Sequence, residues 1–328
     1  MSPIRSACAA SLVVAVLALI ACGGGGDGTD GATAVAIPPA TGIPVTPRTS
    51  GTTLGLHGIA WDGTQFVVVA DSGGLVTSPD GATWTSLFNN PNAPCFLTCG
   101  RALNDVVWTG TQFVAVGGRG SIVTSPSGSG WQSRAIGGTT ADLFAIVKAG
   151  SLLVAVGGNP LIGGTSLVSA DGGATWTAYS TGDTDILRGV AWSGTRFVAS
   201  GDNRLFTSTD GARWTAKFLD GGGNSVVWSG TKFVVVGSNG LGGPVLTSSD
   251  GISWAAHSIP STNLLYGVAW SGTEFLAVGQ NGAMLSSPDG TTWTSQGSAT
   301  AQSLSHVAWF PTTKFVLTGA NGTVITSP

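Results

Sequence analysis

The chain has 328 residues, of which 42% are apolar and only 9% are charged, and its formal net charge is −3. So few charges exclude the clustered Lys/Arg surface that nucleic acid requires, and so small a net charge excludes long-range steering of ionic partners. The apolar residues recur with a period, which excludes an intrinsically disordered chain. The composition therefore indicates a folded repeat protein with a surface built mainly from Gly, Ser, Thr and Asn.

The N-terminus has the pattern of an export signal. Arg5 precedes an apolar run from Ser11 to Ile20 that is too short to span a bilayer as a permanent helix. Leu19-Ile20-Ala21-Cys22 resembles the bacterial lipobox, in which the cysteine is lipidated and becomes the first mature residue. We predict a lipoprotein signal peptide over residues 1–21 and a lipid on Cys22, which anchors the chain to a membrane without spanning it. An ordinary secretory signal that contains this cysteine is the alternative.

A Gly/Pro-rich tether over residues 22–42 follows. Gly23, and not Asp, comes after the cysteine, which resembles the pattern of Gram-negative lipoproteins sorted to the outer membrane of the cell envelope. Further along, Cys95 and Cys99 are the two remaining cysteines of the mature chain, and an exported compartment is oxidising, so we expect a short-loop disulfide. A metal clip is the alternative, although no second Cys or His pair lies nearby in sequence.

All twelve tryptophans fall on two positions of one repeat. The first position holds Trp61, Trp108, Trp192, Trp228, Trp270 and Trp309, and the second holds Trp84, Trp131, Trp176, Trp214, Trp254 and Trp293. Lys148 takes the first position in the third copy, so seven copies can be counted, roughly 40 residues apart. Each copy contains four short extended segments separated by Ser-Gly, Asn-Gly or Asp-Gly, which are hairpin signals. We predict an all-β, seven-bladed β-propeller with four-stranded blades over residues 43–328, with the Trp columns as core wedges.

The last copy stops one strand short. Thr323 to Pro328 ends where the other copies continue into Asp-Gly and a fourth strand. Residues 43–54, ahead of the first copy, are placed to supply the missing strand and to close the ring. The alternative is that these residues merely extend the tether without structure.

A tight turn precedes the second tryptophan of most copies, as in Ser169-Ala170-Asp171-Gly172-Gly173-Ala174-Thr175-Trp176. The Asp accepts backbone N–H groups, the Gly supplies a positive φ, and the indole covers the turn. Five copies carry the carboxylate, and Ser127 replaces it in the second copy: Asp80, Asp171, Asp210, Asp250 and Asp289. Each turn has one carboxylate on its own blade, too few for Ca²⁺, so we expect structural turns and no metal or cofactor.

These turns and repeats resemble the Asp-box (BNR) propellers of the sialidase-like superfamily, which includes sialidases, tandem-propeller xyloglucanases and a photosystem II assembly factor. The resemblance covers residues 54–328 and implies the fold. It does not imply activity, because Asp-boxes occur in enzymes and non-enzymes of that group.

A sialidase-like site implies three Arg gripping a carboxylate, a Tyr nucleophile backed by Glu, and an Asp acid/base. The chain has two tyrosines, Tyr179 and Tyr266, and a single Glu274, whose turn we expect on the face opposite Tyr266. We therefore assign no catalytic residue. A glycoside hydrolase or lyase with two carboxylates is the alternative, with candidates Asp71, Asp105, Asp183, Asp185 and Asp202. His57, His257 and His306 are too scattered to indicate a Ser-His-Asp triad.

Function is expected where the copies differ. One variable position lies four residues before the first Trp position and holds His57, Asn104, Phe144, Arg188, Asn224, Tyr266 and Ser305. The other is the loop between the second and third strands, which carries Asp71, Arg119, Asn159, Asp202, Arg204, Asn239 and Asn281. Both should lie on one face, at the mouth of the central channel, and form a polar funnel that binds a protein or a glycan. The alternatives are that these residues only solvate the channel and cap strands, and that the chain is a structural surface protein.

Overall fold

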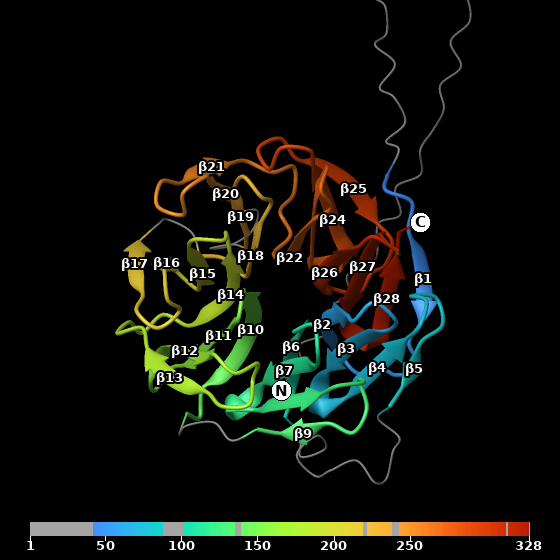
Figure 1. Ribbon diagram of the computed structural model, residues 1–328. Coiled ribbons are helices and arrows are strands. Elements are labelled where there is room, and N and C mark those ends of the chain that lie inside the picture. The colour runs from blue at the N-terminus through green and yellow to red at the C-terminus, as the bar shows by residue number, and fades with distance from the viewer. Residues whose placement is uncertain are drawn as a thin grey trace, which may run out of the picture. The chain divides into compact units, whose positions relative to one another are not determined.

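A computed structural model describes residues 42–87, 101–134, 139–218, 222–237, 243–312 and 314–327. They form seven four-stranded antiparallel sheets arranged as blades in a ring (Figure 1), which confirms the predicted all-β, seven-bladed propeller. In these ranges no helix is long and apolar enough to cross a membrane. The signal peptide, the tether up to residue 41, Cys22 and the Cys95–Cys99 pair lie outside the described residues.

Each of the first six blades uses four consecutive strands, the first of them nearest the channel. Blades 1 to 3 consist of β2 (Leu56–Trp61), β3 (Phe66–Ala70), β4 (Leu75–Ser78) and β5 (Thr85–Ser86); β6 (Leu103–Trp108), β7 (Phe113–Gly117), β8 (Ile122–Ser125) and β9 (Gln132–Ser133); and β10 (Asp142–Ala149), β11 (Leu152–Asn159), β12 (Gly163–Ser169) and β13 (Thr177–Ser180).

The remaining blades follow the same order, except that blade 7 takes its outer strand from the N-terminal side of the chain. Blades 4 to 7 consist of β14 (Leu187–Trp192), β15 (Phe197–Gly201), β16 (Arg204–Ser208) and β17 (Thr215–Phe218); β18 (Ser225–Trp228), β19 (Phe233–Val236), β20 (Val245–Ser248) and β21 (Ala255–His257); β22 (Leu265–Trp270), β23 (Phe275–Gly279), β24 (Ala283–Ser287) and β25 (Thr294–Ser298); and β26 (Leu304–Phe310), β27 (Lys314–Gly319), β28 (Thr323–Thr326) and β1 (Thr46–Thr49).

The ring closes through β1, as predicted. This strand pairs antiparallel with β28 from Thr46↔Thr326 to Thr49↔Thr323. The segment before it also reaches blade 6, because the Ile43 backbone N–H donates to Gln296 Oε1 at 3.0 Å and the Ile43 side chain joins the core between blades 6 and 7. The alternative of an unstructured extension is therefore wrong.

The repeated aromatic residues fill the interfaces between blades. In blade 1, Phe66 lies 4.2 Å from Trp61 and 5.9 Å from Trp84, measured between ring centroids, and this cluster packs against Val316 and Val324 of blade 7. The same Trp–Phe–Trp arrangement recurs in blades 2, 4, 5 and 6. An apolar sheet cannot bury both faces alone, so each blade depends on its neighbours.

The Asp turns close as the sequence predicts. In blade 3, Asp171 accepts the backbone N–H of Ala174 and Thr175 at 3.0 Å, and Trp176 Nε1 donates to the Gly173 carbonyl at 3.1 Å. These N–H and hydroxyl donors stabilise the ionised form and hold the pKa of Asp171 well below its usual range.

The Gly-Thr-x-Phe turns also connect neighbouring blades, which the sequence did not indicate. The donors are the residues that precede the Phe: Gln65 Nε2 donates to the Ser127 carbonyl at 2.6 Å, Gln112 Nε2 to the Gly172 carbonyl at 2.9 Å, and Lys232 Nζ to the Asp289 carbonyl at 2.9 Å. Each acceptor belongs to the Asp turn, or its equivalent, of the next blade. On the face opposite the channel mouth, neighbouring blades are therefore connected by hydrogen bonds of the same kind.

Candidate binding site at the channel mouth

In six of the seven blades a β-bulge turns a side chain toward the channel. In blade 4, Leu187 pairs with Gly201 and Gly189 with Ser200, so Arg188 has no partner across the ladder. The corresponding strands of blades 1, 2, 3, 6 and 7 carry the same register shift. In blade 5 the strand begins one residue after the equivalent position, Asn224. A bulge changes the direction of the extra residue's side chain, so that this side chain can face the channel.

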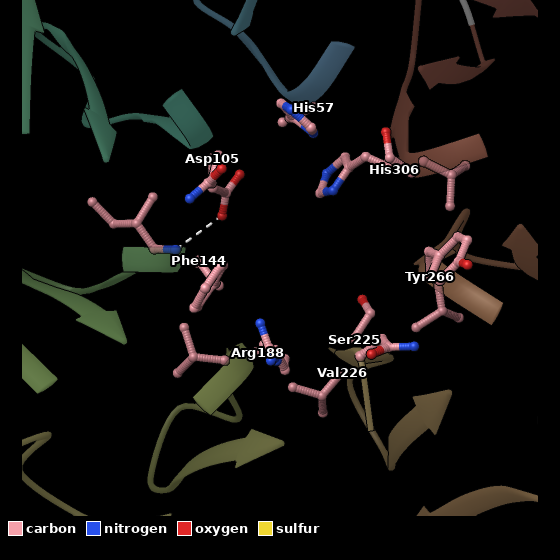
Figure 2. A pocket seen from close by; sticks show the side chains of 18 of the residues that line it. His57, Asp105, Phe144, Arg188, Ser225, Val226, Tyr266 and His306 are labelled. Carbon is pink, nitrogen blue, oxygen red and sulfur yellow. Dashed lines mark hydrogen bonds between the residues drawn. The ribbon is translucent and has the colours of Figure 1, made fainter. Parts of the chain in front are cut away.

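The displayed residues meet at one cavity on the axis of the ring, of about 530 Å³. It is lined by all seven predicted residues of the first variable position, one from each blade: His57, Asn104, Phe144, Arg188, Asn224, Tyr266 and Ser305. Figure 2 shows His57, Phe144, Arg188 and Tyr266 around this opening. The repeat offset therefore places these seven side chains together.

Arg188 and His57 at the mouth are each paired with a carboxylate of their own blade. Arg188 Nε donates to Asp202 Oδ1 at 2.7 Å, and Arg188 Nη2 donates to Asp202 Oδ2 at 3.2 Å. His57 Nε2 lies 2.9 Å from Asp71 Oδ1. In both blades the carboxylate comes from the loop between the second and third strands, fourteen residues further along the chain. Asp71 and Asp202 thus act at the mouth through these partners.

Three polar residues at the mouth tie their blade to the next one. Asn104 Nδ2 donates to the Leu143 carbonyl and Asn224 Nδ2 to the Leu265 carbonyl, each at 2.8 Å. Ser305 Oγ donates to the Leu56 carbonyl at 2.5 Å. The acceptors are the carbonyls just before the neighbouring bulges, so these three side chains have a structural role as well as a place on the cavity wall.

The two aromatic residues complete the mouth. The Arg188 guanidinium carbon lies 4.6 Å from the centroid of the Phe144 ring, within range of a cation–π contact. Tyr266 comes from blade 6 and is half-buried at the cavity wall. Tyr and Arg are among the residue types enriched at protein interfaces.

The other loop residues lie away from the cavity wall. Arg119 is exposed and adopts a positive φ of 54° in the turn Gly118–Gly120, where its backbone N–H donates to Asp142 of blade 3. Arg204, at the start of β16, pairs with Asp183. Asn159 Oδ1 accepts the backbone N–H of Leu161 at 2.9 Å and so caps its own turn. Asn239 lies outside the described residues.

A second layer of the wall was not predicted. The residue after the first variable position also lines the cavity in six blades. It is Gly or Ala in three of them, and Asp105, Ser225 and His306 in blades 2, 5 and 7. The signal was present, since three polar residues interrupt a column that otherwise holds small ones. Gly58 is small for a reason, because a Cβ there would lie 2.6 Å from the Cα of Asp105.

The two ionisable groups of this layer are strongly perturbed. Removal from bulk water raises the pKa of Asp105 to about 7, although its Oδ2 accepts the Ile146 N–H at 2.9 Å and its Oδ1 accepts the Val106 N–H at 2.8 Å. Desolvation, assisted by the facing His57, lowers the pKa of His306 to about 4. Near neutral pH His306 is therefore a neutral imidazole with an acceptor nitrogen.

The five carboxylates considered for hydrolysis all have partners in the described part of the chain. Asp71 and Asp202 pair with His57 and Arg188, Asp183 pairs with Arg204, Asp105 accepts backbone N–H groups, and Asp185 accepts the Asn203 N–H. Of the lining residues only Asp105 is a carboxylate. No group of three or more His, Cys, Asp or Glu residues in these ranges could hold a metal ion.

The fold defines a seven-bladed β-propeller with a cavity on its axis, and comparison with solved structures agrees with this fold. The chain is similar to YCF48 bound to a D1 peptide, with 17% identity and a TM-score of 0.70 over 89% of this chain and 99% of that one. It is similar to YCF48 from Cyanidioschyzon merolae, with 15% identity and a TM-score of 0.67 over 86% and 98%.

A chain of a mitotic checkpoint complex is also similar, with 13% identity and a TM-score of 0.65 over 88% of this chain and 95% of that one. At these identities the similarity shows the fold alone. No protein-family model and no curated protein matches the chain.

Proposed function

We propose that this chain is a non-catalytic binding module of the bacterial cell envelope that presents its channel mouth to a protein partner. The observation that carries the proposal is that one cavity collects seven residues of six types, one from each blade, and that six of them lie at β-bulges, while the core residues of the blades are repeated. Repeated residues maintain the scaffold, and residues that differ on one face of a rigid scaffold are where recognition concentrates.

A protein is favoured over a glycan as the partner. One structural neighbour was solved with a peptide and another within a protein complex. Phe144, Arg188 and Tyr266 at the mouth belong to the residue types enriched at the centres of protein interfaces. A glycoside hydrolase would require two carboxylates flanking one bond, whereas the candidates here are held in separate contacts.

Membership of the Asp-box propellers of the sialidase-like superfamily is part of the same proposal. It is supported by the turn geometry, in which the Ser hydroxyl, the Asp carboxylate and the Trp indole each bond within the turn. In blade 6, Ser287 Oγ donates to Asp289 Oδ1 at 3.0 Å, and Trp293 Nε1 donates to the Gly290 carbonyl at 3.0 Å.

The binding proposal is tested by capture from an envelope extract with the purified protein. The double variant Arg188→Ala/Tyr266→Ala removes the guanidinium and one ring from the mouth. A matched control, Arg213→Ala/Glu274→Ala, removes the same number of side chains from turns on the opposite face, where Arg213 is 93% exposed. We expect at least a tenfold loss of a protein partner with the mouth variant and full capture with the control, since central anchors contribute about 2 kcal/mol or more each.

Unchanged protein capture by the mouth variant would contradict the proposal. Loss of binding only on a glycan array would replace the protein partner with a carbohydrate.

We further propose that Cys22 carries the lipid and that the protein resides in the outer membrane, tethered by residues 22–42. The support is the lipobox pattern of residues 19–22 and the Gly after the cysteine. Cys22→Ser should abolish the attachment of lipid and leave the signal uncleaved at residue 21, both read by mass spectrometry of the N-terminus. A soluble wild-type protein that begins elsewhere would contradict the anchor.

A further inference from the structure

The second layer of the cavity wall contains three hydrogen-bond acceptors at equivalent positions in different blades. They are the Asp105 carboxylate in blade 2, the Ser225 hydroxyl in blade 5 and the His306 imidazole in blade 7. Two blades separate 2 from 5, one separates 5 from 7, and one separates 7 from 2. The acceptors are therefore distributed around the axis, and Figure 2 shows them reaching the cavity from different sides.

Asp105 is the one lining carboxylate in the described residues, and no side-chain cation neutralises it. Arg188, the cation at the mouth, already has a carboxylate partner in Asp202, and the His57 ring lies against Asp71. Desolvation keeps His306 uncharged near neutral pH, because it lowers the pKa of that imidazole to about 4. A cation that enters the cavity thus faces two neutral acceptors and the Asp105 carboxyl, whose ionised form has no side-chain cation to neutralise it.

We propose that this layer binds a primary alkylammonium group, inserted along the channel axis and bound by Asp105, Ser225 and His306. The inference rests on the proposed function, because the group would be delivered by whatever docks at the mouth. An ammonium has three N–H donors and a narrow flexible stem, which suits three acceptors spread around an axis. A guanidinium suits the site less well, because it pairs best with both oxygens of a carboxylate. Here Asp105 already accepts a backbone N–H on each oxygen.

Two sources share this chemistry, a lysine side chain of a protein partner and a free amine. The mouth residues immediately precede this layer in every blade, so a lysine stem of four carbons spans the step from mouth to acceptor layer. Phe144 and Tyr266 flank that path with apolar ring surface for the stem. Either source must release the group from water, and the uncompensated charge of Asp105 offsets that cost.

The test is a titration of the wild-type protein with n-butylammonium chloride, followed by ¹³C NMR of the side-chain carboxyls. Ordinary Asp carboxyls titrate near pH 4, so the signal that titrates near pH 7 identifies Asp105 without a variant. An ammonium that binds the ionised form should lower this apparent pKa by about one pH unit at ten times its Kd. n-Butanol, which has the same stem without charge, should leave it unchanged.

Variants give an independent reading. Asp105→Asn should abolish saturable butylammonium binding, whereas Asp62→Asn, which removes the same charge from the turn at the far end of β2, should retain it. Because Asp105→Asn could fail to fold, Ser225→Ala and His306→Gln serve as second variants and should each weaken binding several-fold. No saturable binding to the wild type, an unshifted Asp105 signal, or equal binding by a folded Asp105→Asn protein would overturn the proposal.

The outcome separates this inference from the proposed function. If partner capture depends on Arg188 and Tyr266 but butylammonium does not bind, only the ammonium site is overturned. If butylammonium binds and competes with the captured protein, the source is a lysine of the partner. If it binds without competing, the source is a free amine, and the ammonium site is supported independently of the docking proposal.

Discussion

The two faces of the ring differ in how closely their residues repeat from blade to blade. On the face away from the mouth, the second tryptophan of every blade that has one donates its indole N–H to a turn carbonyl at 2.9 to 3.2 Å. At the mouth, the equivalent residues include a stacked guanidinium, a His–Asp pair and an amide tie to the next blade. Residues that make the same buried contact in each blade are repeated, whereas the residues that face the channel can differ from blade to blade.

The largest expected effect comes from removing the strand that closes the ring. Deleting residues 43–54 exposes the edge of β28 and uncovers the core between blades 6 and 7. We expect the loss of most of the unfolding free energy, several kcal/mol of the roughly 5–15 kcal/mol typical of a domain. Urea unfolding measures it. Deletion of residues 24–35, of equal length, is the control, and a wild-type midpoint for the first deletion would show that the ring closes without β1.

The second prediction compares the loss of stability from a core substitution with the loss from a substitution at the mouth. Phe275 is 1% exposed and lies between Trp270 and Trp293, so Phe275→Ala should cost about 3–5 kcal/mol of unfolding free energy. Tyr266→Ala, one strand away on the half-buried wall, should cost less than about 1 kcal/mol. Equal losses in urea unfolding would mean that the mouth is part of the core rather than a display surface.

The sequence predicted the scaffold because its signals are local and recur in every blade. The Trp–Phe–Trp clusters, the Asp turns and the missing last strand are each readable from residue spacing alone. The first layer of the site was found through the repeat offset from Trp61 and its equivalents. The second layer was missed, because regular alternation would put neighbouring residues on opposite faces.

The bulge breaks that alternation and turns both Asn104 and Asp105 toward the channel. Pairings such as Arg188 with Asp202 could not be predicted either, since they depend on side-chain geometry between a strand and a loop that vary independently between blades.

The third prediction concerns the pH dependence of the second layer. Because the folded pKa of Asp105 is raised to about 7, its contribution to stability is full below its ordinary pKa and is lost as pH rises through 7. Asp105→Asn does not ionise, so its stability relative to the wild type should rise between pH 4 and 8. Full linkage would give roughly 4 kcal/mol, reduced to about 2 kcal/mol because the channel admits water. Parallel stability curves for the two proteins in urea unfolding would contradict it.

The smallest expected effect comes from giving blade 2 the regular Asp turn that it lacks. Blade 2 has Ser127 in place of the Asp, and its Gly130 has a φ of 60° where blade 1 has Thr83. A carboxylate at residue 127 gains acceptors for backbone N–H groups only if the chain adopts the regular turn, which a threonine at residue 130 favours. Ser127→Asp/Gly130→Thr should therefore stabilise the protein by about 1 kcal/mol.

Gly130→Thr alone should destabilise it, because threonine is strained at a positive φ. Thermal unfolding of the two single variants and the double variant measures this coupling. Strictly additive effects would show that the turn geometry of blade 2 is imposed by its neighbours, such as the Gln65 contact to the Ser127 carbonyl, and not by its own residues.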